Sequence, residues 1–203
     1  MRPKRIILDL DDVLNTLSLD LLRFDGLDFA CYDDIGEWEW GYDIIGAVQQ
    51  LRQDDERMGV VEYWERIPRE LWANTRLSWE FNDILNFCEN AVGRENILVG
   101  TSPTKCPECL AGKYEWMMRY LPTWIHRQWS ITPRKWEYGR DPGAVLIDDL
   151  EDNCGKFTQT PDINDRAPRG QAILVPRPWN CLSNEDVMDS IQEQWENMCY
   201  AEA

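Results

Sequence analysis

Five short runs of apolar and β-branched residues are spread along the chain, and each is bounded by glycine, proline or polar residues. They are residues 5–9 (RIILD), 96–100 (NILVG), 128–132 (QWSIT), 144–148 (AVLID) and 172–175 (AILV). None of these runs alternates strictly between apolar and polar positions, which is typical of strands that are covered on both faces. We therefore predict five buried β-strands.

Helical patterns fill the gaps between these strands from residue 78 onward. Ser78 is the expected N-cap of a helix that stops at Gly93, and a second helix is predicted over residues 107–121, with Pro107 in its first turn. Apolar residues at helical spacing after Glu185 predict a terminal helix. Strands that alternate with helices are typical of a parallel sheet, so the pattern predicts an α/β fold.

The interval of residues 15–77 interrupts this alternation. It contains no convincing strand, whereas residues 42–57 and 60–76 show helical patterns. A helical insertion after the first strand accounts for both observations. We therefore predict an α/β core made of residues 1–14 and 78–203, with residues 15–77 as an inserted helical unit.

Tryptophan is unusually frequent, because the 203 residues include eleven of them. Four fall in the predicted insertion: Trp38, Trp40, Trp64 and Trp72. A small helical unit needs large apolar anchors, so we expect most of these side chains to belong to its core. We expect one of the four to face a pocket, and the sequence does not indicate which.

The chain carries 37 acidic and 21 basic residues, a formal net charge of −16. So negative a field repels polyanions and acidic lipid surfaces, which disfavours long nucleic acids and membranes as partners. The basic N-terminus precedes an apolar run of only three residues before Asp9, which is too short for a signal-peptide core. No stretch approaches the roughly 20 apolar residues of a membrane helix. We expect a soluble, cytoplasmic protein.

Seven cysteines, an odd number, are scattered without a repeated spacing, which is typical of reduced thiols in an intracellular protein. One pair, Cys106 and Cys109, has the spacing of metal ligands. A structural zinc site needs a second such pair or histidines, and His126 is the single histidine of the chain. Zinc is therefore disfavoured, although the sequence alone does not decide whether this pair binds a metal.

Chemically useful side chains follow four of the predicted strands. They are Asp9 and Asp11 after the first strand, Thr101 and Ser102 after the second, Lys135 shortly after the third, and Asp148 and Asp149 at the end of the fourth. In an open parallel α/β sheet, ligands bind outside the carboxyl ends of the strands. We therefore expect these side chains to meet at one edge of the sheet.

Acids from two strands, together with a lysine and hydroxyl groups, suit phosphoryl chemistry. Magnesium prefers one or two protein carboxylates, with waters and phosphate oxygens as its other ligands. A lysine and hydroxyl donors stabilise the charge of a transferring phosphoryl group. A carboxylate can attack phosphorus to form an aspartyl-phosphate, and an acid two residues away can protonate the leaving oxygen. The pattern favours a magnesium-dependent phosphotransfer site.

In this order along the chain, the motifs resemble those of the haloacid dehalogenase-like (HAD) phosphohydrolases. The stretches that carry the resemblance are DLDDV at 9–13, Thr101 after ILVG, Lys135, and VLIDDLEDN at 145–153. The resemblance implies a Rossmann-like parallel core with a small helical cap inserted after the first strand. It also implies a phosphatase that forms an aspartyl-phosphate and uses Mg²⁺ as its cofactor.

The resemblance also implies a role for each matching residue. Asp9 would be the nucleophile and a metal ligand, and Asp11 the general acid/base, whose backbone carbonyl also binds the metal. Thr101 would hold the transferring phosphoryl group together with Ser102, and Lys135 would neutralise the aspartyl-phosphate.

In the last motif, the spacing from Asp149 to Asn153 matches the family's pattern and makes Asp149 a metal ligand. Asp148 and Asn153 would then orient the site from beside the metal.

A finer similarity is to the 5'(3')-deoxyribonucleotidase branch and its phage-type relatives. It rests on TSP at 101–103, GKYEWM at 112–117, TPRK at 132–135 and ILVPRPWN at 173–180. This similarity implies that Lys113 is a second phosphate-binding lysine and that the substrate is a (deoxy)nucleoside monophosphate. Asp12 occupies a position that is often glycine in the family, and the sequence assigns it no role.

Two other functions stay open at this point. One is a polynucleotide 3'-phosphatase or a protein phosphatase on the same core, which the large insertion and the net charge of −16 disfavour. The other is a catalytically silent binding protein that uses its tryptophan-rich insertion. The sequence also leaves open whether the chain forms a homodimer.

Overall fold

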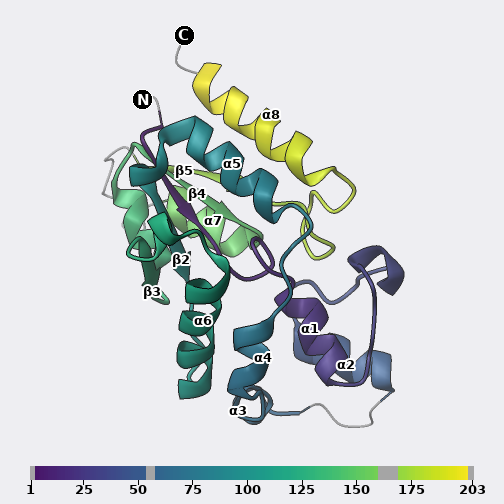
Figure 1. Ribbon diagram of the computed structural model, residues 1–203. Coiled ribbons are helices and arrows are strands. Elements are labelled where there is room, and N and C mark those ends of the chain that lie inside the picture. Colours follow the sequence, from purple (N-terminus) through teal and green to yellow (C-terminus); the bar gives the residue numbers. More distant parts are fainter. Residues whose placement is uncertain (1–2, 54–57, 160–168, 201–203) are drawn as a thin grey trace.

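A five-stranded parallel sheet lies at the centre of the computed structural model, which describes residues 3–53, 58–159 and 169–200 (Figure 1). The strands are β1 (Arg5–Leu8), β2 (Ile97–Thr101), β3 (Trp129–Ile131), β4 (Ala144–Asp148) and β5 (Gln171–Leu174). Their order in the sheet is β3-β2-β1-β4-β5, and every neighbouring pair is parallel. The predicted α/β fold with five parallel strands is confirmed.

Each face of the sheet is covered by helices, as the unbroken apolar strands predict. Ile6 and Leu8 point to one face, where α5 (Phe81–Val92), α6 (Pro107–Tyr120) and α8 (Val187–Tyr200) complete the main hydrophobic core. Ile7 points to the other face and packs near Phe157 of α7 (Glu151–Thr158). Short 3₁₀ turns occupy Arg94–Asn96, Thr123–Ile125 and Lys135–Arg140 (η2, η3 and η4). Ile6, Ile7 and Leu8 are all fully buried, which explains why β1 does not alternate between apolar and polar positions.

Three predicted helices are present, with one correction at a cap. The helices near 81–92, 107–120 and 187–200 agree with the predicted ones. Ser78, however, does not cap α5, because the capping position is Glu80 and no side chain caps the helix. The Ser78 hydroxyl instead donates to the carbonyl of Val13 at 2.8 Å. A contact between segments far apart in sequence has replaced the local one.

The segment between β1 and α5, called the insert here (residues 15–77), contains short helices joined by loops, and no strand among the residues that the structure describes. It contains α1 (Leu17–Phe24), a 3₁₀ turn η1 (Tyr32–Ile35), α2 (Ile44–Arg52), α3 (Val60–Glu65) and α4 (Arg69–Asn74). The prediction missed α1, and the single helix predicted over 60–76 is two helices with Pro68 between them. The helix predicted over 42–57 is shorter, and residues 54–57 lie outside the described residues.

The insert has its own hydrophobic cluster and is joined to the core by two adjacent segments. Leucines of α1 pack with Ile45, Tyr63 and Trp72 in a cluster separate from the main core. Where the chain enters and leaves the insert, Asn15 and Leu77 form an antiparallel bridge, and the backbone amide of Thr16 donates to the Arg76 carbonyl at 3.0 Å. The two ends of the insert are thus tied to each other.

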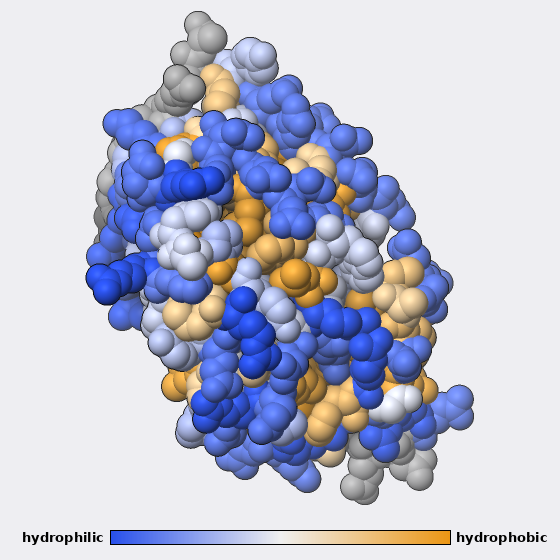
Figure 2. All heavy atoms as spheres, viewed as in Figure 1, coloured by the Kyte–Doolittle hydropathy of each residue, from blue (hydrophilic) through white to orange (hydrophobic). Residues whose placement is uncertain are grey.

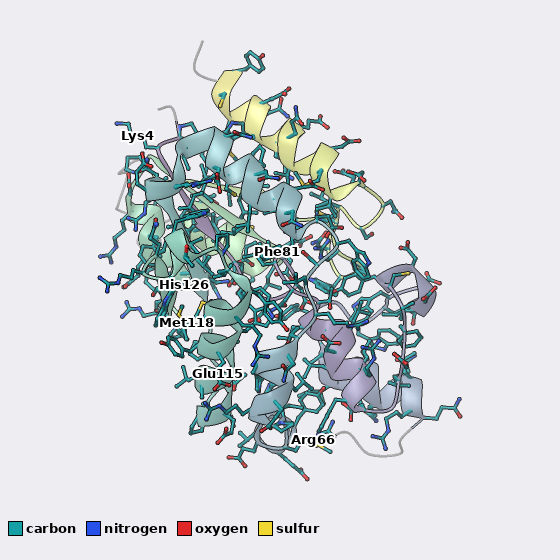
Figure 3. All side chains as sticks on the ribbon, in the orientation of Figure 1. Lys4, Arg66, Phe81, Glu115, Met118 and His126 are labelled. Atoms are coloured by element: carbon teal, nitrogen blue, oxygen red, sulfur yellow. The ribbon has the colours of Figure 1, made fainter. Side chains whose placement is uncertain are left out.

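Helix α4 packs directly against α6, so the last helix of the insert lies on the core (Figure 1). The contact is close because α6 has Gly112 at this point: a Cβ there would lie 2.3 Å from the Cβ of Trp72. Arg69 of α4 also pairs with Glu115 of α6, which Figure 3 labels. Phe81, labelled in the same figure, marks the end of α5 nearest the insert.

The surface in this view is mostly hydrophilic, with hydrophobic residues gathered in patches near its middle and over the insert (Figure 2). Among the helices of the described residues, none combines the length and the apolar character needed to cross a membrane.

Candidate functional site

The strand order places the ends of β1 and β4 beside each other at the point where the topology reverses. From β1 the chain builds β2 and β3 on one side, and β4 and β5 then follow on the other. Leu8 is in register with Ile147, and the backbone amide of Asp9 donates to the Ile147 carbonyl at 2.9 Å. Asp9 therefore lies next to Asp148 at the carboxyl edge of the sheet, where ligands of such folds bind.

Three carboxylates form a compact group at this edge. One oxygen from each of Asp9, Asp148 and Asp149 lies within 4.8 Å of the others, and the three residues are only 5%, 0% and 2% exposed. Hard oxygen ligands at this spacing fit a small divalent cation such as Mg²⁺. Asp148, expected to support the site from beside the metal, thus has its own carboxylate in the group.

Lys135 connects two of these acids. Its ammonium nitrogen lies 2.7 Å from Oδ2 of Asp9 and 2.6 Å from Oδ2 of Asp148, and the residue is 3% exposed. Burial alone would lower the pKa of Lys135, but the charges of Asp9 and Asp148 outweigh it and raise the pKa above its ordinary value. Asn153 donates to both oxygens of Asp148, at 2.9 and 3.1 Å, and thereby fixes that carboxylate.

Lys113 forms a second buried pair, with Asp11. Lys113 lies on helix α6, and its ammonium group donates to Oδ2 of Asp11, to the hydroxyl of Thr101 at 2.9 Å, and to the backbone carbonyl of Ser102. The Thr101 hydroxyl itself donates to Asp11 at 3.1 Å. Two lysines from different elements therefore reach the two acids that follow β1.

The acids outnumber the cations at this edge. Four carboxylates (Asp9, Asp11, Asp148 and Asp149) face two lysines, and Asp12 lies close enough to repel Asp149. If all are ionised, negative charge is in excess, which a divalent cation would offset. Burial raises the pKa of Asp9 to about 8, with Asp148 and Asp11 adding repulsion and Lys135 opposing it. Burial, followed by repulsion from Asp148 and Asp12, raises the pKa of Asp149 well above its ordinary value. A bound divalent cation would favour the ionised forms.

Asp12 connects the loop after β1 to the insert. Its backbone is left-handed, with φ of 55°, a conformation that aspartate tolerates better than most residues. Its carboxylate accepts hydrogen bonds from the amide and hydroxyl of Ser18, at 2.8 and 2.7 Å, and from the hydroxyl of Tyr32 at 2.7 Å. Burial raises the pKa of Asp12 to about 6, although the Ser18 and Tyr32 hydrogen bonds oppose the shift.

A pocket of about 420 Å³ opens over these acids and lysines. Its polar lining includes Asp9, Asp11, Ser102, Lys113, Lys135 and Asn153. The insert contributes a mostly apolar wall made of Leu17, Tyr42, Val60, Val61, Trp64 and Trp72. The volume is in the range of small-molecule sites. The pocket therefore joins a charged floor to an aromatic and aliphatic wall.

The expected residues differ in how they relate to this pocket. Thr101 and Asp149 are not part of the pocket lining as described, and the Thr101 hydroxyl is engaged with Lys113 and Asp11. Two of the insert tryptophans, Trp64 and Trp72, line the pocket where one was expected. Trp38 instead lines a small neighbouring cavity.

Sequence reasoning did not place the loop that follows β5 against these acids. The guanidinium of Arg177 donates through Nε to the Asp12 carbonyl at 2.6 Å. The indole N–H of Trp179 donates to Oδ2 of Asp149 at 2.9 Å, and the Asn180 side chain donates to the Asp149 carbonyl at 2.9 Å. The stretch ILVPRPWN marked this loop by resemblance alone, and no spacing rule connects it to Asp12 or Asp149.

Comparison with known proteins adds no family. No family model matches the chain. No curated protein matches it at a significant level.

Proposed function

We propose that this protein is a magnesium-dependent phosphomonoester hydrolase of the haloacid dehalogenase-like type, which acts on small phosphate esters, nucleoside monophosphates first. The observation that carries the proposal is the pairing of two buried lysines with the two acids that follow β1, on the floor of a pocket. The resemblance of the sequence motifs supports the same chemistry.

The charges of the site suit a phosphate dianion. Lys113 and Lys135 are each 3% exposed and would donate to phosphate oxygens in a site with little competing water. Asp9 and Asp149 would hold a divalent cation, with Asp148 beside them. When bound, the cation supplies positive charge that reduces repulsion between the Asp9 carboxylate and the phosphate.

The two acids after β1 would divide the reaction between them. An oxygen of Asp9 attacks phosphorus while the bond from phosphorus to the ester oxygen breaks, and the departing oxygen takes a proton from Asp11. Water then attacks the aspartyl-phosphate and gives a proton to Asp11, and the bond from phosphorus to Asp9 breaks to release phosphate. Lys135, paired with Asp9, would stabilise the charge that develops in both steps.

The wall of the pocket favours an ester with a flat or apolar group. Trp64, Trp72 and Tyr42 present aromatic rings and Val60 and Val61 present methyl groups, all within one pocket that has the two lysines at its floor. Stacking of a base on an aromatic side chain contributes about 1–3 kcal/mol. A nucleoside monophosphate would place its phosphate on the charged floor and its base against this wall.

The test is a phosphomonoester screen with and without Mg²⁺, run on the wild type and on Asp9→Asn. The panel includes nucleoside 5'- and 3'-monophosphates, sugar phosphates and 3'-phosphorylated oligonucleotides. We expect Mg²⁺-dependent release of phosphate from mononucleotides, and a loss of about 10⁴-fold or more in kcat for Asp9→Asn.

The matched control is Asp83→Asn, which changes an exposed aspartate on α5 and is expected to keep full activity. Full turnover by Asp9→Asn would contradict the proposed mechanism. Faster hydrolysis of the 3'-phosphorylated oligonucleotides than of the mononucleotides would instead indicate that the substrate is the phosphorylated end of a polynucleotide.

A further inference from the structure

Trp179 lies between the acids of the site and the insert. Its indole N–H donates to Oδ2 of Asp149 at 2.9 Å, and its ring packs against aromatic rings of the insert. Ring centroids lie 5.4 Å from Tyr32, 5.4 Å from Trp38 and 6.0 Å from Tyr42. The Trp179 side chain therefore contacts one carboxylate of the three-acid group and three aromatic residues of the insert, one in η1 and two in the loop that follows it.

The loop that carries Trp179 is itself fixed to the same acid. Asn180 donates to the Asp149 backbone carbonyl and to the carbonyl of Val175, at 2.9 and 2.8 Å. Asn180 thus holds the backbone of Asp149, while Trp179 holds the end of its side chain. A hydrogen bond to one carboxylate oxygen limits rotation of the group and sets the direction of the other oxygen.

One aromatic neighbour of Trp179 also lines the proposed substrate pocket, and another lines the small cavity beside it. Tyr42 packs on Trp179 and lines the pocket, and Trp38 packs on Trp179 from the adjacent small cavity. A change in the packing of the insert would therefore shift the indole ring, and with it the hydrogen bond to Asp149.

We propose that Trp179 is a positioning residue that holds the Asp149 carboxylate in its cation-binding orientation and makes this orientation depend on the aromatic packing of the insert. The inference rests on the proposed function in so far as Asp149 binds a divalent cation. It does not require that the substrate be a nucleotide. Trp179 touches no reacting atom, so its removal acts through Asp149.

Two variants separate the hydrogen bond from the packing. Trp179→Phe keeps an aromatic ring but removes the indole N–H. Trp38→Leu removes the ring packing on Trp179, together with the Trp38 hydrogen bond to the Gly41 carbonyl, and leaves the Trp179 N–H in place. The control is Trp129→Phe, which also loses one indole hydrogen bond of 2.9 Å, to the carbonyl of His126, away from the three-acid group. Affinity for Mg²⁺ and Mn²⁺ is measured by titration calorimetry, and kcat and KM are measured across Mg²⁺ concentrations.

We expect Trp179→Phe to weaken cation binding by about 10-fold and to need correspondingly more Mg²⁺ for activity, while KM at saturating Mg²⁺ stays near the wild-type value. Trp38→Leu weakens cation binding by about threefold. In the double variant, which combines Trp38→Leu with Trp179→Phe, the Trp38 change causes no further loss of cation affinity. Its effect passes through the hydrogen bond from Trp179 to Asp149, which Trp179→Phe has already removed. Trp129→Phe binds the cation as the wild type does.

Wild-type cation affinity in Trp179→Phe overturns the proposal, as does a full threefold additional loss in the double variant. A wild type that binds neither cation overturns it too. If the wild type binds the cation but hydrolyses no phosphomonoester, the proposed function fails while the affinities still decide this inference. If Trp179→Phe does not fold by circular dichroism, Trp38→Leu decides: a weakened affinity supports the coupling, and wild-type affinity overturns it.

Discussion

The carboxyl edge of the sheet and the pocket wall of the insert are built on opposite physical principles. At the edge, Asp9, Lys135 and Asp148 are at most 5% exposed and are held by hydrogen bonds and ion pairs of 2.6 to 3.1 Å. On the wall, Val60 and Val61 are 56% and 54% exposed and contribute methyl groups to the pocket. The edge is buried and charged, whereas this outer part of the wall is exposed and apolar.

The difference suggests a division of work between the two regions. Removing one partner of a buried ion pair lowers the free energy of unfolding by several kcal/mol, so the edge tolerates little change. Such a fixed arrangement suits chemistry that needs a defined geometry. Truncating an exposed apolar side chain costs little stability, so the exposed part of the wall can vary without unfolding the protein. Changes at the edge should therefore affect stability and kcat, and changes on the wall should affect KM.

The largest effect is expected from Lys135→Met. The variant removes the ammonium group that Asp9 and Asp148 share in a buried site. We therefore expect the free energy of unfolding to fall by about 3–5 kcal/mol at pH 9, above the pKa of Asp9, measured by urea denaturation without divalent cations. Lys156→Met is the control, because Lys156 pairs with Asp152 on the exposed side of α7 and should contribute under about 1 kcal/mol. Equal effects of the two variants would mean that the edge is not an unusually sensitive region.

The second effect concerns Mg²⁺ and pH. The pKa of Asp9 is about 8 in the folded chain against an ordinary 3.8, so between these values the folded chain holds more protons than the unfolded one. The free energy of unfolding of the metal-free protein therefore falls as pH rises through this window. Mg²⁺ binds the ionised acids, so its stabilising effect should grow from pH 5 to pH 8.

At pH 8 and a Mg²⁺ concentration 100 times Kd, the stabilisation should reach about 2.7 kcal/mol, measured by urea denaturation. Sodium chloride at matched ionic strength is the control. Stabilisation of the same size at both pH values would show that ionisation of the buried acids is not linked to cation binding.

The third effect tests how the insert is fixed to the core. A Cβ at Gly112 would lie 2.3 Å from the Cβ of Trp72 and 2.8 Å from the Arg69 carbonyl oxygen, so Gly112→Ala must push α4 away from α6. We expect a loss of about 1–3 kcal/mol in the free energy of unfolding. Gly155→Ala on α7 is the matched control, because the new Cβ would meet no atom within 4 Å beyond the nearby backbone of its own helix, and helix propensity should stabilise the variant by about 1 kcal/mol.

Features that depend on local sequence could be predicted, whereas contacts between distant segments could not. The strands follow from short apolar runs, and the meeting of Asp9 with Asp148 follows from the rule that parallel strands share a carboxyl edge. The hydroxyl of Ser78 could not be placed, because it donates to Val13, 65 residues away. The bond from Trp179 to Asp149 spans 30 residues between two loops, and local patterns carry no sign of it.

Motif resemblance, and not the helix pattern, predicts a phosphate-binding role for Lys113, because its helix pattern is that of any surface lysine. Its 3% exposure depends on α4, which covers α6 at Gly112 and brings Trp72 over the ammonium group at 5.4 Å from the ring centroid. A helix surface becomes a buried site only when the insert packs on it. Tertiary packing of this kind is what periodicity alone does not encode.

The smallest effect, and the one that bears most directly on the wall, is expected from Trp64→Ala. Trp64 is half-buried and lines the pocket from the insert, so its removal should leave the chemical step intact and weaken binding of an aromatic base. We expect KM for a nucleoside monophosphate to rise about 10-fold at nearly unchanged kcat, in line with the loss of one stacking contact. Trp79→Ala, at an exposed tryptophan outside this pocket, should leave KM unchanged. A fall in kcat with KM unchanged would instead place Trp64 with the chemistry of the edge.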